Sequence, residues 1–233
     1  LRRPSDRNTV MFTYYCFTAE IGSDDSKCVK EAAALLIPRL GDGIPELGIE
    51  PPVDPLLIKK SDASSPNLKL ILTDYTVSGL KNCIPKKVKY DKSKSKILLK
   101  LLCTVQLEGT YDMKGQLLIL PLEGNGPIHV TLNKAEISIE LDLDEIEKDG
   151  VKYWNIKDHK FSYVLKDKSV VVFDNLFGGN DVLASAVKDV IAESGNDIIL
   201  EVGLPIITDT VKGVIDRIDK MFHQIPISEL TFD

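Results

Sequence analysis

The sequence has few of the residues that most often build catalytic or metal sites. Its 233 residues include only three histidines, and His129, His159 and His223 lie far from one another and from any cysteine. Such spacing fits no zinc-site pattern. Nucleophile-elbow, Walker and zinc-protease motifs are absent as well. We therefore expect no catalytic residues, no metal and no cofactor, and an enzyme is the less favoured class.

Long apolar runs and a positive net charge are also missing. No stretch approaches the roughly 20 consecutive apolar residues of a membrane-spanning helix, because Lys100 and Glu201 interrupt the longest runs. The formal net charge of −6 argues against nucleic acid as the main partner, since that affinity comes from Lys and Arg neutralising phosphates. With 43% hydrophobic residues, the chain can bury enough apolar surface to fold. We expect a globular protein without a membrane span.

The N-terminal part of the chain divides at residue 16. Residues 1–15 are predicted to be an N-terminal arm or a leader remnant, because a basic start is followed by an apolar run too short for a signal-peptide core. Residues 16–233 are predicted to form a single domain. Its first element is a helix that Asp24, Asp25 or Ser26 can cap, with apolar residues from 29 to 40 at three-to-four spacing.

Glycine and proline dominate the sequence that follows this helix. Gly41 to Gly43 is predicted to end the helix, and residues 43–60 are rich in proline. Proline favours extended or turn backbone and disrupts central strands. We expect residues 43–60 to be an extended connecting ribbon.

The middle of the chain has the two-residue period of β-strands. From Leu68 to about Phe173, strands and turn signals alternate as in an antiparallel meander. The clearest hairpin joins 88–90 to 97–107 through a turn at 91–95. On its return strand the odd-numbered side chains are apolar and predicted to be buried, whereas the other face is polar except for Leu98 and Leu102.

Two further features predict a strongly curved sheet. Gly124-Asn125-Gly126 is predicted to be a hairpin turn. The apolar positions then change parity between 132 and 137, so a β-bulge is expected near 133–136. Bulges bend and twist the strand that carries them.

The last third of the chain returns to helical spacing. Asn180 or Asp181 can cap a helix that continues to Phe222 and is apolar around much of its girth, which predicts burial on several sides. Gly203 and Pro205 are expected to kink it. A single helix of this length would measure about 65 Å, too long for a compact globule. We therefore favour an elongated molecule, with the sheet around the helix, over a helix that folds back near Gly203.

The four cysteines leave more than one arrangement open. Cys16 and Cys28 could pin the N-terminal arm to the first helix, which would require an oxidising compartment; the alternative is four reduced thiols. Cys103 shares the inward face of its strand. Cys83 should point outward by alternation unless Pro85 marks a bulge. No bridge between Cys83 and Cys103 is therefore expected.

Several ordered motifs resemble the insect takeout and juvenile-hormone-binding protein family. Each motif is weakly specific alone, but the ordered set spans about Cys16 to Leu230. The motifs are Gly43 to Ile49, Asp54-Pro55-Leu56, Gly79 to Asn82, Gly109-Thr110-Tyr111, Gly115 to Pro121, Gly124-Asn125-Gly126 and Asn175 to Asn180.

The resemblance implies an α+β fold in which a strongly curved antiparallel sheet wraps a long kinked C-terminal helix, as in tubular lipid-binding proteins. It also implies a secreted, extracellular carrier in a haemolymph-like fluid, without a catalytic site and with a Cys16–Cys28 disulfide. Because no cysteine follows Cys103, the takeout-like branch fits better than the hormone-binding branch. We expect a monomer with a hydrophobic small-molecule partner, isoprenoid, juvenile-hormone-like or fatty-acid-like.

An internal apolar cavity or tunnel would be lined by inward side chains of the sheet and the last helix. The alternatives are an ordinary packed core, with a role in protein or membrane interaction instead of transport, and a cryptic lipid-ester hydrolase. Tyr90 and the Cys103 thiol are the candidate polar anchors. The predicted lining residues are Val88, Tyr90, Leu99, Leu101, Cys103, Leu117, Ile119, Val130, Leu132, Ile137, Ile139, Val187, Ile191, Val214, Ile218, Met221 and Phe222.

Overall fold

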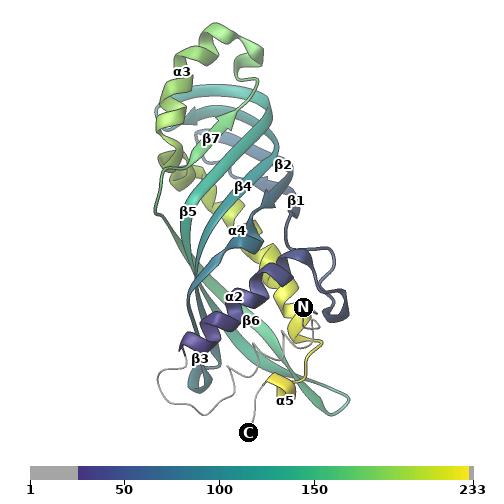
Figure 1. Cartoon of the computed structure of the whole chain (residues 1–233). Helices are drawn as coiled ribbons and strands as arrows, with labels where there is room; N and C mark the ends of the chain where they lie inside the picture. The colour runs from purple at the N-terminus through teal and green to yellow at the C-terminus, as the bar shows by residue number, and fades with distance from the viewer. Residues whose placement is uncertain (1–25, 231–233) are drawn as a thin grey trace, which may run out of the picture.

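An elongated, curled antiparallel sheet surrounds a long C-terminal helix (Figure 1). The computed structural model describes residues 26–230. The expectations for residues 1–15, for a Cys16–Cys28 disulfide and for capping by Asp24 or Asp25 lie outside the described residues. Within them, the predicted α+β class and the wrapped arrangement are confirmed.

The first described helix, α2 (Ser26–Asp42), matches the predicted one. A short 3₁₀ turn, η1 (Pro45–Leu47), follows. The proline-rich ribbon is shorter than expected, because strand β1 (Leu56–Asp62) already pairs with β2 (Leu68–Ser78). Prolines occupy the positions before β1, where no ladder hydrogen bond is needed.

Seven strands form one sheet in the order β1-β2-β4-β5-β6, with β3 added on β4 and β7 on β5. The remaining strands are β3 (Ile84–Asp91), β4 (Lys96–Leu117), β5 (Leu120–Lys148), β6 (Val151–Leu165) and β7 (Val170–Phe173). The predicted hairpin is confirmed as β3 and β4, joined by the 3₁₀ turn η3 (Lys92–Lys94).

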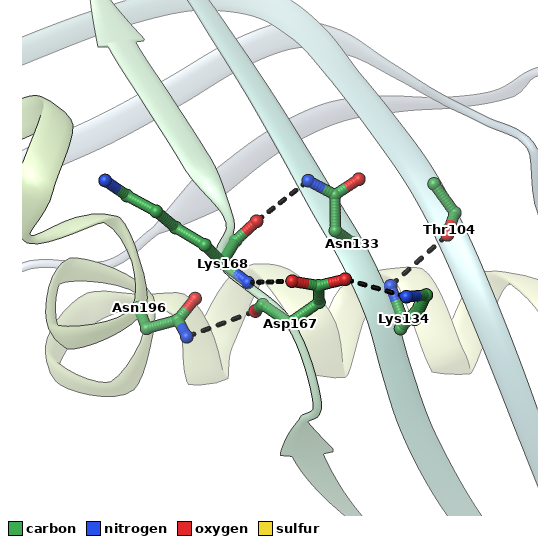
Figure 2. A network of polar contacts seen from close by, with 6 residues as sticks. All are labelled: Thr104, Asn133, Lys134, Asp167, Lys168 and Asn196. Atoms are coloured by element: carbon green, nitrogen blue, oxygen red, sulfur yellow. Dashed lines mark hydrogen bonds and ion pairs between the residues drawn. The ribbon is translucent and has the colours of Figure 1, made fainter.

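The predicted bulge in β5 is confirmed. Cys103 pairs with Ala135 and Val105 with Leu132, so residues 133 and 134 of β5 together oppose the single residue Thr104 of β4. Figure 2 shows what holds the bulge: the Lys134 backbone N–H donates to Thr104 Oγ1 (3.2 Å), and its ammonium pairs with Asp167 (2.9 Å). The backbone carbonyl of Asp167 accepts in turn from the side chain of Asn196, which lies in the long C-terminal helix (3.2 Å).

The expected turn at Gly124-Asn125-Gly126 is wrong. These residues lie inside β5 and pair with β4, and the chain reverses instead between Leu117 and Leu120. Here glycine is required by close approach. A Cβ on Gly124 would lie 2.7 Å from the Tyr111 hydroxyl and 3.0 Å from the Leu176 Cα. The two glycines therefore let the segment after β7 cross the strand.

The C-terminal helix is interrupted earlier than predicted. Helix α3 (Asp181–Glu193) is capped at its N-terminus by Asn180, whose side chain accepts from the Leu183 N–H (3.2 Å). Ser194 is its C-terminal cap. Helix α4 (Gly195–Phe222) then runs continuously through Gly203 and Pro205. The break falls at Ser194 because the next residues pack on the β6–β7 connection, where Asn196 accepts from the Ser169 N–H (2.9 Å).

Helix α4 is less enclosed than its composition suggests. One side of it packs into the curled sheet, but Leu200 and Leu204 are 60% and 54% exposed. A last short helix, α5 (Ile227–Leu230), lies near β6. Within 26–230, none of the helices has a stretch both long and apolar enough to cross a bilayer.

Candidate functional site

A cavity of about 290 Å³ lies between the concave face of the sheet, α4 and α2. Its walls are almost wholly apolar: among residues 26–230, apart from glycines, a disulfide and the indole of Trp154, the polar side chains in the lining are those of Lys81 and Thr210. Pockets of this kind, lined by hydrophobic groups with few polar atoms, are typical of small-molecule sites.

Strand alternation builds the sheet side of the cavity. Alternate residues of β4, from Leu99 through Leu101 to Val105, point inward and line it. From α4, Ile199, Val202 and Ile206 line the opposite wall at three-to-four spacing. The two periodicities bring apolar side chains together from both elements.

Many inward side chains are only half-buried although protein surrounds them. Leu101 on β4, Ile137 on β5 and Val214 on α4 all line the cavity, and each is of intermediate burial. In a tightly packed interior they would be covered by neighbouring atoms. Their remaining exposure is toward the hollow.

The cavity brings together most of the residues proposed from the sequence to line it. Those in its wall are Val88, Leu99, Leu101, Cys103, Val130, Leu132, Ile137, Ile139, Val214, Ile218, Met221 and Phe222. Contact with a ligand stays a prediction for all of them.

Five proposed residues lie elsewhere. Leu117 and Ile191 are buried in the core beyond the cavity, and Val187 packs against that core. Tyr90 stacks on Trp154, with ring centroids 5.2 Å apart. Ile119 was expected to face inward but is 83% exposed, because it lies in the reversal between β4 and β5.

Helix α2 supplies a wall that the sequence prediction omitted. Ala33, Leu36, Ile37 and Leu40 all line the cavity. Their three-to-four spacing identified an amphipathic helix, but that pattern does not say what the apolar stripe covers. Trp154 of β6 was missed for a related reason, since it comes from the far edge of the sheet.

The expectation of no bridge between Cys83 and Cys103 is wrong. The two residues form a disulfide, and both line the cavity. The register between β3 and β4 shifts between Pro85 and Lys87. This is the bulge that the alternation argument named as its exception, and it turns Cys83 inward. Cys103 consequently has no thiol to anchor a ligand.

Beside the cavity wall is a buried polar chain. The hydroxyl of Tyr75, which is fully buried, lies 2.7 Å from Ser61 Oγ. Ser61 also donates to Asp209, and Thr210 donates to the Ile206 carbonyl (2.9 Å). Burial, with a contribution from the Asp209 carboxylate, raises the pKa of Tyr75 to about 12. Tyr75 is therefore a neutral hydroxyl.

Lys81 is a partly exposed residue of the cavity wall. It lines the cavity, yet its side chain is 42% exposed and its ammonium pairs with Asp42 of α2 (2.9 Å). The Lys81 backbone N–H donates to the buried Asp54 carboxylate (3.0 Å). The ion pair therefore connects the end of α2 to the short turn η2 (Leu80–Asn82) at the cavity margin.

The fold and the cavity define a class: a curled sheet around a helix, with a hollow apolar interior. Within that class, the chain belongs to the haemolymph juvenile hormone binding protein family, whose sequence profile matches residues 17–231. This is the family, which includes takeout proteins, that the ordered motifs resemble, and the recognition is confirmed. The family is one of hydrophobic-ligand-binding carriers.

The proteins similar to the chain include curated relatives and a solved structure. The circadian clock-controlled protein daywake of Drosophila melanogaster is 29% identical over 173 residues, and that of Drosophila yakuba is 28% identical. Each match covers 68% of this chain and 65% of the relative. The crystal structure of Epiphyas postvittana Takeout 1 superposes with a TM-score of 0.85 at 24% identity, covering 90% of this chain and 97% of that one.

Proposed function

We propose that the protein is a secreted carrier that encloses one hydrophobic small molecule, isoprenoid or fatty-acid-like, in the cavity. The observation that carries the proposal is the composition of the wall: in the described part of the chain, apolar side chains from the sheet, α4 and α2 surround about 290 Å³, and few polar side chains, such as Lys81 and Thr210, interrupt them. A wall of this kind favours an apolar guest over a polar one.

The expected affinity follows from the area such a guest would bury. At about 0.8 kcal/mol per buried CH₂, a 15-carbon chain gains roughly 12 kcal/mol before costs. Association costs about 4 to 15 kcal/mol. Affinity in the micromolar range or somewhat tighter is reasonable, and selectivity would follow length and girth, since one methylene changes discrimination by only about 1 to 3 kcal/mol.

The polar groups of the wall support binding rather than catalysis. The Thr210 hydroxyl donates to the Ile206 carbonyl. The hydrogen bond and ion pair with Asp42 raise the pKa of Lys81, so its amine stays protonated and is a poor nucleophile. The Cys83–Cys103 disulfide supports an oxidising, extracellular location.

Displacement of a fluorescent fatty acid from delipidated protein tests the proposal. Val130 lines the cavity and pairs with Val171 of β7. The next residue of β7, Val172, is 41% exposed and serves as the matched control. We expect Val130→Trp to weaken binding at least about tenfold by filling the hollow, whereas Val172→Trp should leave it unchanged. Native mass spectrometry of protein purified without delipidation should show a bound lipid.

Two results would contradict the carrier function. One is a protein that takes up no member of an isoprenoid and fatty-acid panel and carries no lipid when purified. The other is equal loss of binding in both tryptophan variants, which would place the ligand outside the cavity.

A further inference from the structure

Lysines are concentrated in one short segment of an acidic protein. Residues 81–100 contain eight lysines and a single acidic residue, Asp91, and carry a formal charge of +7, whereas the whole chain carries −6. Most of this segment forms the hairpin of β3 and β4 with the turn η3 between them. The positive charge is therefore gathered on one structural unit.

The outward face of this hairpin mixes lysines with apolar side chains. Lys87 pairs across the strands with Lys100, Lys89 with Leu98, and Ile84 with Leu102. Because paired residues share a face of the sheet, Leu98 and Leu102, the apolar exceptions on the polar face of β4, lie beside Ile84, which is 53% exposed. We call these six residues, with the exposed Lys86 of the bulge, the hairpin surface.

Ion pairing divides the lysines of the sheet, and one member of the hairpin surface, Lys100, pairs with Glu136 (3.4 Å). Lys59, Lys69 and Lys114 pair with Asp74, Asp112 and Glu123. By contrast, within residues 26–230 no ion pair to a carboxylate involves Lys86, Lys87 or Lys89, and all three are exposed. Their charge is available to an anionic partner.

A shallow hollow of about 400 Å³ begins at the hairpin surface and extends across β5 to β6. Lys87, Leu98, Lys100 and Lys160 border it. Glu140 also borders it, but its carboxylate pairs with Lys96. The hollow is basic at its edge and apolar at Leu98, which suits an anionic headgroup above acyl chains.

The hairpin surface adjoins an exposed part of the cavity wall. Lys81, which lines the cavity and has a side chain 42% exposed, belongs to η2, two residues short of β3. Val88 of β3 points inward and lines the cavity. Helix α2, which forms another wall, lies beside β3 (Figure 1). A partner on the hairpin surface would therefore sit next to this exposed part of the wall.

We propose that the hairpin surface docks the protein on an anionic lipid bilayer. Clustered lysines attract anionic lipids, and exposed apolar side chains among them enter the interface. The choice of a bilayer over an acidic protein rests on the proposed carrier function, because a membrane is where a water-insoluble guest is collected or released. Docking there brings the exposed part of the cavity wall at Lys81 close to the membrane.

Cosedimentation with vesicles tests the docking. Wild-type protein should bind vesicles of phosphatidylcholine with phosphatidylserine, and not phosphatidylcholine alone. Each lysine near an anionic surface changes the partition coefficient onto vesicles roughly fivefold. The triple variant Lys86→Gln/Lys87→Gln/Lys89→Gln should therefore have a partition coefficient about 100-fold lower. The control Lys59→Gln/Lys69→Gln/Lys114→Gln makes the same change of net charge and should retain most of the binding.

Equal loss in both triple variants, or no binding of wild-type protein to anionic vesicles, would overturn the proposal. Binding of polyglutamate through the same lysines without vesicle binding would overturn it too, in favour of an acidic protein partner. Fatty-acid displacement in solution separates the two proposals. A lysine triple variant that still exchanges the fatty acid but no longer binds vesicles supports both the carrier function and the docking. Wild-type protein that binds vesicles but takes up no ligand would refute only the carrier function.

Discussion

Tyr75 shows how a single residue is placed by its neighbours in three elements. A Cβ on Gly109 of β4 would overlap the Tyr75 side chain, so the glycine makes room for it. The register of β2 shifts between Thr73 and Thr76, which turns the ring inward. Its hydroxyl meets Ser61 of β1, which connects to Asp209 of α4. A buried hydroxyl with a partner stabilises the packing of helix on sheet.

The raised pKa of Tyr75 predicts a stability change in alkali. Its folded pKa of about 12 lies above the ordinary value of 10.0, so the unfolded chain loses this proton first as pH rises. The stabilisation is complete below pH 10 and is lost between about 10 and 12. We expect Tyr75→Phe to remove up to about 2 kcal/mol of this pH dependence, measured by denaturant unfolding across that range.

Absorbance at alkaline pH provides an independent readout of the same residue. Tyr111, whose hydroxyl donates to the Asp174 carbonyl, also has a pKa raised to about 12 by burial. Wild-type protein should therefore show late-ionising tyrosines, of which Tyr75→Phe removes one. An unchanged late phase in that variant would contradict the assignment.

At the scale of elements, bulges decide which face a side chain occupies. The bulge at Pro85–Lys87 turns Cys83 toward Cys103, and the bulge at 133–134 keeps the apolar residues of β5 inward on both sides of it. One bulge was foreseen because the apolar pattern on both sides reveals a change of parity. The other was named only as an exception to the alternation, because the consecutive Lys86 and Lys87 leave no such pattern.

Removal of the disulfide should weaken the fold without abolishing the cavity. Cys83 and Cys103 are separated by 20 residues, and closing a loop of this size contributes about 3 kcal/mol on the chain-entropy estimate. We expect Cys83→Ser/Cys103→Ser to lower the free energy of unfolding by about that amount, measured by urea denaturation. A loss below about 1 kcal/mol would show that β3 is held mainly by its ladder and by α2.

At the scale of the whole molecule, the hollow is the consequence of curvature. The sheet curls around α4, and α2 covers the side left open. The apolar faces of the sheet, α4 and α2 therefore meet around a cavity that they do not fill. The interruption at Ser194 lets α3 leave the axis while α4 continues along it.

Ligand binding in the hollow should stabilise the whole domain. A ligand that binds only the folded state, at about 100 times its dissociation constant, adds about 2.7 kcal/mol to the free energy of unfolding. We expect delipidated protein to show a corresponding rise in Tm with a fatty acid, and Val130→Trp to show little. A ligand that binds but leaves the Tm of delipidated protein unchanged would contradict uptake into the folded interior.

The sequence by itself determined the fold class, the β3–β4 hairpin, the first helix and part of the cavity wall. Local periodicity and an ordered set of family motifs carry that information, since alternation and three-to-four spacing assign side chains to faces. Only the tertiary structure decided the partner of Cys103, the crossing at Gly124 and the contribution of α2. Those features depend on which segments, distant in the sequence, meet in the fold. A local sequence pattern does not carry that information.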